Sequence, residues 1–391
     1  MTIIFTKPSA QHLAKIVEQV PMEYPDFKKL DEDLVKFYQK MRLTPEMMAE
    51  REEYVQRLQC YLTLETALSH YLGENGVWIR SIVKYGSMAT HCATRDSDLD
   101  ICICASYSGA YQPSPAIILQ AIYEDLQHNH HAKEYFGLEG VSDLVFISTA
   151  KVPILKFKMN GVEVDMSVSF DIISPPKSVL AARLVNAYCQ LDERFTILVI
   201  FLKSWMKSEL GNTDFMRDFP NSYSLILMLI HVLQWHGIMP NLHETHPHLF
   251  NLEWKEESMY PLEWTGKFTD SSEMKPIYSF SDVMEHQQRS TNTLSVAQLL
   301  HIFSTQYSNN IIINCCKLDM RSGMLETRGE RDNAPIFIQD VFDTRNPARS
   351  VRGNEMVQAL QCVSKLFSNP KNLLFQRIWR VTRMKTYLLP R

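Results

Sequence analysis

The sequence of 391 residues lacks several features that would assign a protein to a class at once. It has no excess of positive charge, because its net charge is −4. The chain as a whole is therefore not a polybasic nucleic-acid binder, and any such contact needs a local basic cleft. The C-terminus, where no acid follows Glu355, is one such place, although a charge-compensating solvated tail is an equally good interpretation. Its cations include Lys371, Arg377, Arg380, Arg383, Lys385 and Arg391.

Long apolar runs, internal repeats and low-complexity tracts are also missing. The longest uncharged apolar stretch, residues 223–235, is too short to cross a bilayer. The eight cysteines form no Cys-x-x-Cys pair and mostly lie in apolar runs, which predicts reduced core residues in an intracellular compartment. No secretory signal opens the chain. The first seventeen residues hold Lys7 and Lys15 but no acid, which suits an organelle-targeting segment or simply a folded N-terminus.

Periodicity indicates helices at both ends of the chain and strands between them, and the length allows two or three domains. A helix opens at Thr44-Pro45, with the threonine as N-cap and the proline at the first helical position. Asn160-Gly161 predicts a hairpin turn between two strands. Helical spacing is expected over residues 10–72, 116–127, 178–210, 222–236 and 294–307, and strand character over 77–79, 99–104, 144–157, 162–168 and the start of 333–343.

The most informative motif is Gly86-Ser87, followed by Asp98-Leu99-Asp100. The glycine lets backbone approach a phosphate, and the serine offers a hydroxyl and an N–H to it. In a strand Asp98 and Asp100 share one face, where two carboxylates repel each other unless a cation lies between them. An Asp-x-Asp pair alone is usually a solvated surface, but the Gly-Ser turn and the buried strand that follows favour a metal site.

A third carboxylate comes from the strand over residues 162–168. There Val164 and Met166 share one face, while Glu163, Asp165 and Ser167 share the other. Asp165 is thus available to the same metal site, and the alternative is a solvent-facing strand residue.

Residues 238–292 have weak periodicity and are interpreted as an insertion of short elements. The histidines at 243, 246 and 248 do not have the spacing of a standard zinc site, so surface histidines are favoured. The aromatic residues of the insertion suggest a docking or RNA surface: Trp254, Tyr260, Trp264 and Tyr278.

These motifs resemble those of the DNA polymerase β-like nucleotidyltransferases, and more narrowly the noncanonical poly(A) polymerase and terminal uridylyltransferase group. The resemblance spans residues 79–351 and rests on five ordered motifs. They are Gly86-Ser87 with Asp98-Leu99-Asp100, Lys151 to Ile154 leading to Asp165, Tyr188 to Arg194 leading to Lys203 and Lys207, Asn221-Ser222-Tyr223, and Ile338 to Asp343 with Ala348 to Val351. The brevity of the chain is similar to that of the minimal trypanosomal terminal uridylyltransferases, including the small mitochondrial one associated with an RNA-editing complex.

The resemblance implies a metal-binding catalytic triad of Asp98, Asp100 and Asp165 holding two Mg²⁺ or Mn²⁺ ions. It implies that the triphosphate is bound by Gly86, Ser87, Lys203, Lys207 and Ser222, and that Tyr223 stacks on the base. Without the resemblance, the two lysines would be interpreted as solvated side chains and the tyrosine as a core residue. It further implies that Asp340 and Asp343 lie opposite the base edge. A carboxylate accepts from uracil N3–H or from an adenine amino group, so the pair alone does not decide selectivity.

Two departures from the group stand out. Asp343 stands where the group usually has a glutamate, whose side chain is one carbon longer. The usual Asn-Ser or Asn-Thr pair falls at Ala181-Ala182, which cannot hydrogen-bond through side chains, so ribose or base reading must come from elsewhere or be weaker.

The resemblance predicts an α/β (α+β) fold with a polymerase β-like mixed-sheet catalytic lobe, a mostly helical base-binding lobe and a cleft between them. The expected domains are N-terminal helices (1–49) packing on the helical lobe, a catalytic domain (50–172) and a helical domain (173–391) that contains the insertion. The expected function is RNA 3′-terminal uridylyl transfer from UTP with pyrophosphate release. The alternatives are a poly(A) polymerase using ATP or an inactive RNA-binding scaffold, with a small-molecule nucleotidyltransferase disfavoured by the 340–349 segment and the helical lobe.

The expected partners are UTP, an RNA 3′ end and a multiprotein RNA-editing complex, without a membrane. The expected compartment is the mitochondrion, otherwise the cytoplasm.

Overall fold

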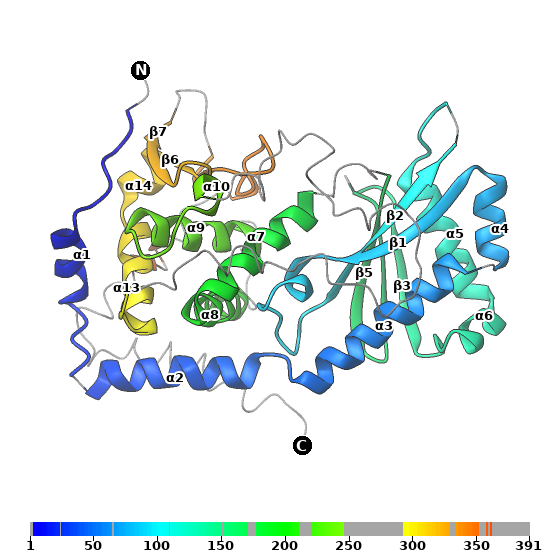
Figure 1. Cartoon of the computed structure of the whole chain (residues 1–391), viewed down its shortest axis with the longest axis horizontal. Coiled ribbons are helices and arrows are strands. Elements are labelled where there is room, and N and C mark those ends of the chain that lie inside the picture. Colours follow the sequence, from blue (N-terminus) through cyan, green and yellow to red (C-terminus); the bar gives the residue numbers. More distant parts are fainter. Residues whose placement is uncertain are drawn as a thin grey trace. The chain divides into compact units, whose positions relative to one another are not determined.

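The structure is a computed structural model, and it describes residues 3–23, 25–64, 66–108, 110–150, 152–170, 177–210, 220–245, 292–328, 334–351, 357–358 and 360–361. These residues fall into two compact units (Figure 1). Residues 42–186 form the sheet unit. Residues 3–41 and the described residues from 187 onward form the helical unit. Helix α7 (Lys177–Leu191) belongs partly to each.

The sheet unit is a five-stranded mixed sheet in the order β1-β2-β5-β4-β3. Strands β2 and β5 are parallel, and the other neighbours are antiparallel. Its elements are α3 (Pro45–Thr63), α4 (Ala67–Glu74), β1 (Val77–Lys84), the 3-10 turn η1 (Gly86–Ala89), β2 (Leu99–Tyr107), α5 (Pro115–His128), α6 (His130–Tyr135), β3 (Val141–Ile147), β4 (Ile154–Met159) and β5 (Val162–Ser169).

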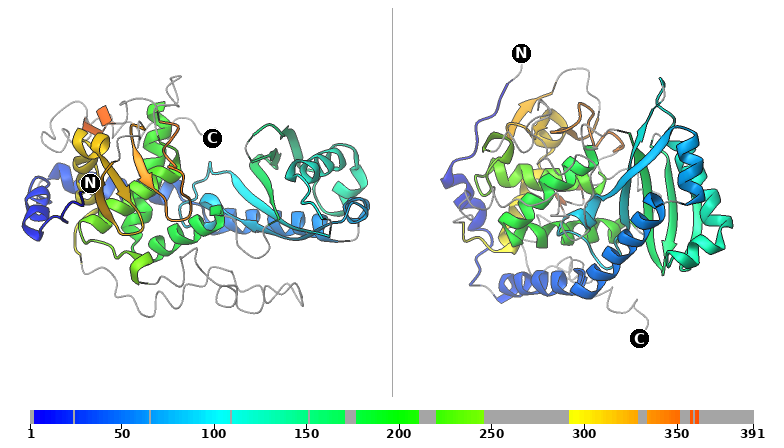
Figure 2. Two further views of the ribbon diagram at one scale, coloured as in Figure 1. Left: turned by 90° about the horizontal axis from the view of Figure 1, so that it is seen from above. Right: turned by 45° about the vertical axis from the view of Figure 1, so that its right-hand side comes forward.

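One face of this sheet is buried under helices α3, α4 and α5 (Figure 2). Alternate residues of β2 and β5, such as Ile101, Val164 and Met166, are fully buried in this core. Asp100 and Asp165 alternate with them and therefore project from the opposite face. Helix α3 begins as predicted, because the Thr44 hydroxyl accepts from the N–H of Met47.

The prediction of one continuous strand over residues 144–157 is wrong. The segment forms two antiparallel strands, β3 and β4, and Pro153 directly precedes β4. Proline has no N–H to donate to a sheet, so the strand is interrupted there. The hairpin at Asn160-Gly161 is confirmed: both residues have positive φ, 49° and 87°, as the tight turn between β4 and β5 requires.

The helical unit packs helices around the long apolar helix α9, whose residues are almost all buried. Phe37 of α2 and Phe201 of α8 meet edge to face, with ring centroids 6.1 Å apart. Its elements are α1 (Ala10–Val17), α2 (Pro25–Met41), α8 (Glu193–Leu210), α9 (Ser222–Trp235), α10 (Leu242–Thr245), α13 (Val296–Tyr307), α14 (Asn310–Cys315), β6 (Cys316–Asp319), β7 (Met324–Thr327) and β8 (Phe337–Gln339). The three strands form a small sheet in the order β7-β6-β8.

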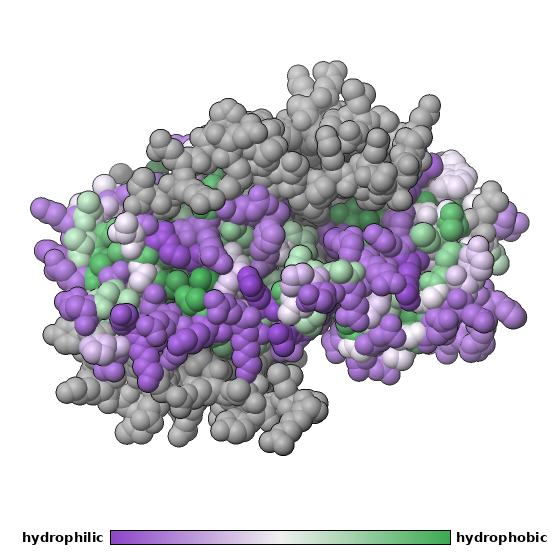
Figure 3. Space-filling model, turned by 60° about the horizontal axis from the view of Figure 1, so that its bottom comes forward, coloured by the Kyte–Doolittle hydropathy of each residue, from purple (hydrophilic) through white to green (hydrophobic). Residues whose placement is uncertain are grey.

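Hydrophilic side chains lie mainly on the surface and apolar side chains in the core, as in other globular proteins. Hydrophilic residues predominate on the described part of the face in Figure 3. Helix α2 keeps Phe27, Leu30 and Leu34 buried and leaves its lysines on the exposed side. Of the cysteines in the described part of the chain, five are buried, as expected, but Cys60 and Cys315 are exposed, so the core prediction is wrong for those two. Among the described residues, no helix has the length and apolarity needed to cross a bilayer.

Candidate functional site

Asp98 and Asp100 flank the first residue of strand β2. Strand β2 begins at Leu99, which is fully buried together with Ile101, while Asp98 and Asp100 are partly exposed. The predicted alternation of core and outward residues is therefore confirmed. Asp98 follows a turn over residues 94–97, and Asp100 lies within the strand.

Asp165 lies beside Asp100. The two are register partners on the parallel strands β2 and β5, and neighbouring strands are about 4.8 Å apart. Two carboxylates in this arrangement repel each other and create a strong preference for a cation. The sequence predicted that these side chains would come from adjacent strands on one face, and the register confirms that placement.

A cation from the chain itself already binds Asp165. Lys156 of β4 is the register partner of Asp165 on its other side. Its ammonium donates to Oδ1 at 2.7 Å and Oδ2 at 2.5 Å. Burial opposes the charged lysine, but the hydrogen bond to Asp165 and the charges of Asp165, Asp98 and Glu163 outweigh it and raise the pKa of Lys156. The charge of Asp98 thus acts on the same ammonium.

Gly86 makes room for Asp100. Its φ is +62°, a conformation that favours glycine, and a Cβ there would lie 2.1 Å from Oδ2 of Asp100. The N–H of Tyr85 donates to the Asp100 carbonyl at 3.0 Å, which ties the turn to the strand. The glycine is therefore needed by the carboxylate itself, in addition to the phosphate role that its motif predicted. Ser87 follows in η1 and is partly exposed.

Two further side chains support this corner. Arg51 of α3 is almost fully buried and donates to the Arg95 carbonyl at 2.9 Å, just before Asp96 and Asp98. Burial lowers the pKa of Arg51, and the nearby Asp96 and Asp98 charges partly restore it. Burial likewise raises the pKa of Tyr85 to about 12, with the Asp100 and Asp165 charges adding to the effect.

Sequence reasoning missed Arg51 and Lys156. For Lys156 a signal existed: a two-residue Asn160-Gly161 turn fixes the register of its hairpin, and counting back from that turn puts Lys156 opposite Asp165. For Arg51 no local signal existed, because its partner lies 44 residues away.

The donor chemistry of this corner fits a divalent metal ion. Three carboxylates supply the hard oxygen ligands that Mg²⁺ and Mn²⁺ prefer, and Asp100 and Asp165 stand side by side. The side chains are not yet gathered into a metal cluster: among the described residues, no three His, Cys, Asp or Glu side chains are so arranged. Asp165 is instead bound to the Lys156 ammonium. The site thus attracts a cation and already holds one.

The helical unit carries the predicted nucleotide-binding residues other than Gly86 and Ser87. Lys203 and Lys207 lie one turn apart on α8, as expected, with Lys207 exposed and Lys203 partly buried. Ser222 is the first residue of α9, and Asn221 caps this helix by accepting from the N–H of Ser224 at 2.9 Å. The Asn221 side chain also donates to the Pro347 carbonyl at 3.0 Å, which fixes the helix start to the segment after β8.

Tyr223 and Asp340 are brought together. The Tyr223 hydroxyl donates to Oδ1 of Asp340 at 3.0 Å, across 117 residues of sequence. Asp340 is only 6% exposed. Burial raises the pKa of Asp340, and hydrogen bonds from Phe342, Tyr223 and Val341 act in the opposite direction. Burial together with the Asp340 charge raises the pKa of Tyr223 well above its usual value.

Asp343 is paired rather than open. Arg345 donates through Nε at 3.0 and 3.1 Å and through Nη2 at 2.5 Å. Asn346 fixes the same segment, because its side chain bonds the backbone of Ile336, Ile338 and Ala348. The segment after β8 is thus built by its own side chains.

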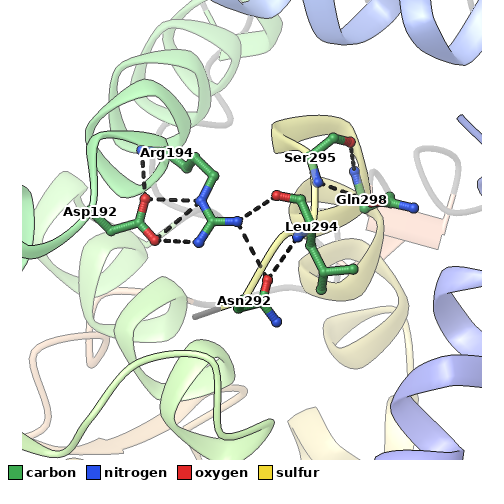
Figure 4. Close-up of polar contacts among 6 residues, drawn as sticks. All are labelled: Asp192, Arg194, Asn292, Leu294, Ser295 and Gln298. Atoms are coloured by element: carbon green, nitrogen blue, oxygen red, sulfur yellow. Dashed lines mark hydrogen bonds and ion pairs between the residues drawn. The ribbon is translucent and has the colours of Figure 1, made fainter. Parts of the chain in front are cut away.

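The motif from Tyr188 to Arg194 has a structural role in the described residues (Figure 4). Arg194 binds both Asp192 oxygens and also donates to the Leu294 carbonyl at 2.5 Å. Asn292 accepts from the same guanidinium, and Ser295 then caps α13 together with Gln298. The motif therefore ties the start of α8 to the start of α13.

Several predicted features lie outside the described residues. They are Lys151, the histidines at 246 and 248, Trp254, Tyr260, Trp264, Tyr278 and the C-terminal cations from Lys371 onward. Of the remaining expectations, Ala182 is buried in α7, and the His243 ring lies 5.7 Å from that of Phe342.

Comparison with known proteins places these observations in a family context. Residues 30–190 match the family model of the central palm domain of poly(A) RNA polymerase, mitochondrial-like. The chain is 32% identical over 174 residues to Poly(A) RNA polymerase GLD2-A of Xenopus laevis, covering 43% of this chain. The chain spans only 31% of the length of that relative.

Solved structures share the fold at low sequence identity. A cytoplasmic RNA terminal U-transferase has a TM-score of 0.63 and 20% identity, covering 90% of this chain and 97% of that one. A GLD-2/RNP-8 complex gives a TM-score of 0.63 and 19% identity, covering 91% and 98%. The predicted polymerase β-like mixed α/β fold is thereby confirmed. The comparisons thus show similarity to a poly(A) RNA polymerase palm domain over residues 30–190 and a fold shared with RNA terminal nucleotidyltransferase structures.

Proposed function

We propose that this protein adds nucleotides from a nucleoside triphosphate to the 3′-hydroxyl of an RNA, with UTP as its substrate and pyrophosphate as the released product. The observation that carries the proposal is the register of Asp100 with Asp165 on neighbouring parallel strands. With Asp98 these residues would hold two Mg²⁺ or Mn²⁺ ions. When bound, such ions activate an attacking hydroxyl and neutralise charge on the triphosphate.

The remaining roles are those that the family resemblance implies. Gly86 and Ser87 offer backbone and hydroxyl groups to phosphate oxygens, and Lys203, Lys207 and Ser222 add charge and a hydroxyl. Tyr223 supplies a ring for the base, oriented by its hydrogen bond to Asp340. The chain contributes no nucleophile of its own in this scheme, since the RNA hydroxyl attacks directly.

The choice of UTP comes from the resemblance to the terminal uridylyltransferases, and Asp340 is the residue proposed to contact the base. An ionised carboxylate accepts from uracil N3–H, directly or through a water. The Arg345 pair leaves Asp343 partly neutralised, which makes Asp340 the stronger candidate reader. A second candidate function is poly(A) synthesis from ATP, because the relative from Xenopus laevis is a poly(A) RNA polymerase and an adenine amino group can also donate to Asp340.

A primer-extension assay tests both functions. The purified chain, a labelled RNA and one triphosphate at a time are combined with Mg²⁺ or Mn²⁺. Preferential extension with UTP supports the proposal, preferential extension with ATP supports the alternative, and no extension with any triphosphate contradicts both and leaves the scaffold interpretation. Asp98→Asn and Asp165→Asn should each reduce transfer at least about 1,000-fold. The exposed neighbour Glu163 on β5 provides the control, and Glu163→Gln should retain activity.

We also propose the mitochondrion as the compartment, and an RNA-editing complex as the partner, both from the resemblance to the small trypanosomal enzyme. Subcellular fractionation of a tagged chain, with nuclease-treated affinity capture, tests both. A cytoplasmic protein that captures no RNA-processing proteins would contradict them.

A further inference from the structure

Lys156 occupies a position at the site that the family motifs leave without a role. It faces Asp165 across the β4–β5 pair. Its ammonium is bound to both oxygens of the carboxylate that the proposed function assigns to a divalent ion. Asp98, the third carboxylate of the proposed triad, acts on the same ammonium by its charge.

We propose that Lys156 is a resident counter-ion that competes with the divalent ion for Asp165. In the metal-free protein it pairs with Asp165, and it must release that carboxylate before Asp165 can serve as a ligand of a divalent ion. Lys156 is thus a positioning residue that sets how tightly the site binds metal before the nucleotide arrives. This inference rests on the proposed function.

The geometry permits such an exchange. The Lys156 side chain is 42% exposed and that of Asp165 16% exposed, so the lysine can swing into water without opening the core. A half-exposed ion pair contributes little net stability. A divalent ion placed among three carboxylates is attracted more strongly than a single ammonium bound to one of them. Exchange therefore favours the metal, but the free energy of metal binding is reduced by the free energy of the Lys156–Asp165 ion pair that is broken.

The strand offers a matched control. Lys158 lies two residues further along β4, so its side chain emerges from the same face. It is 41% exposed and pairs with Asp143 of β3 at 2.8 Å. The two lysines therefore share strand, face, exposure and type of partner, and differ in whether the partner carboxylate belongs to the site.

Titration of the full chain with Mn²⁺ in the absence of nucleotide tests the inference. Electron paramagnetic resonance measures the Mn²⁺ that stays unbound in solution. Lys156→Met should lower the Mn²⁺ dissociation constant about twofold to fivefold, the range expected when a half-exposed ion pair is removed. Lys158→Met should leave it unchanged. Lys156→Arg keeps a cation able to bind both oxygens, and should remain near the wild-type value.

A double variant separates competition from a general charge effect. If Lys156 acts through Asp165, then Lys156→Met should give little further tightening in a chain that already carries Asp165→Asn. Equal tightening in both backgrounds would overturn the inference, as would Mn²⁺ binding in Lys156→Met that is unchanged or weaker. Thermal unfolding of each variant checks that the fold is retained.

The same titration distinguishes the inference from the proposed function. If Asp98→Asn and Asp100→Asn bind Mn²⁺ as tightly as the wild type, or if no variant and no wild-type protein binds it, the proposed metal site itself is wrong. If those variants lose Mn²⁺ and only Lys156→Met fails to tighten it, the function stands and the role of Lys156 is wrong.

Discussion

In the sheet unit, Asp100 and Asp165 lie where backbone pairing puts them. In the helical unit, Asp340 depends on a side chain from a distant part of the chain, whereas Asp343 pairs with Arg345 two residues away. Strand register alone sets Asp100 beside Asp165 and Lys156 opposite it. Asp340 instead takes its hydrogen bond from Tyr223, 117 residues earlier.

The two arrangements have different consequences for charge. The carboxylates of the sheet unit stay partly exposed, where a mobile cation can reach them. Asp340 is buried, and its raised pKa records the energetic penalty for holding a charge there. The difference suits the proposed roles: metal ions must enter and leave the first site, whereas a base reader gains from a fixed orientation.

The largest expected effect is a difference between the units in acid. The buried histidines among the described residues, His231, His236 and His301, all lie in the helical unit, and burial lowers the pKa of each to about 4. Between about pH 6.5 and pH 4 the unfolded chain binds more protons at these sites than the folded one, so stability falls as the pH falls. Each histidine accounts for on the order of 3 kcal/mol when the whole window is crossed.

Urea unfolding at several pH values measures this loss. His301→Gln retains a polar side chain next to Gln19 and should flatten the acid branch of the stability curve. His70, exposed on α4 of the sheet unit, is the matched control, and His70→Gln should leave the curve unchanged. Proteolysis that cuts the sheet unit first in acid would contradict the assignment of the weakness to the helical unit.

The next largest effect is expected when one methyl group is added to the site of the sheet unit. Gly86→Ala places a Cβ at positive φ and 2.1 Å from the Asp100 carboxylate, so the turn or the carboxylate must move. A displacement of this size should reduce transfer at least about 100-fold. Gly161→Ala shares the positive φ but meets no atom within 4 Å, so it has the backbone strain without the clash. Equal activity loss in both variants would refute the close approach to Asp100.

The contrast between the units also explains what could be predicted from the sequence. Alternation determines which face Asp100 and Asp165 share, and the Asn160-Gly161 turn determines the register that puts Lys156 opposite Asp165. The register of β2 with β5 pairs segments 65 residues apart, and no local pattern encodes it. The break at Pro153 was missed because apolar runs lie on both sides of it. The Tyr223–Asp340 bond depends on how distant segments pack, and no local pattern encodes it. The residues between α13 and β8 fold into α14, β6 and β7 without a clear periodic signal.

A smaller expected effect concerns the arginine–aspartate ion pairs of the helical unit and their contribution to stability. Arg194→Met should destabilise the protein by about 2–3 kcal/mol, because it leaves Asp192, whose side chain is 10% exposed, without its charge partner. Arg345→Met removes a pair of the same sequence spacing whose arginine is 46% exposed, and should cost less than about 1 kcal/mol. Denaturant midpoints measure both. Equal losses of stability in the two variants would mean that burial does not determine the contribution of these ion pairs.

The smallest expected effect concerns the bond between Tyr223 and Asp340. Tyr223→Phe removes one donor to a buried carboxylate, worth about 1 kcal/mol, and should raise the KM for the triphosphate about fivefold. Because that donor lowers the pKa of Asp340, its loss should raise the pKa further. Asp340 must be ionised to accept from the base, so activity falls as the pH falls through its pKa. The acid limb of kcat/KM should therefore move to higher pH in Tyr223→Phe and vanish in Asp340→Asn. An acid limb that stays in place in both variants would show that Asp340 does not read the base.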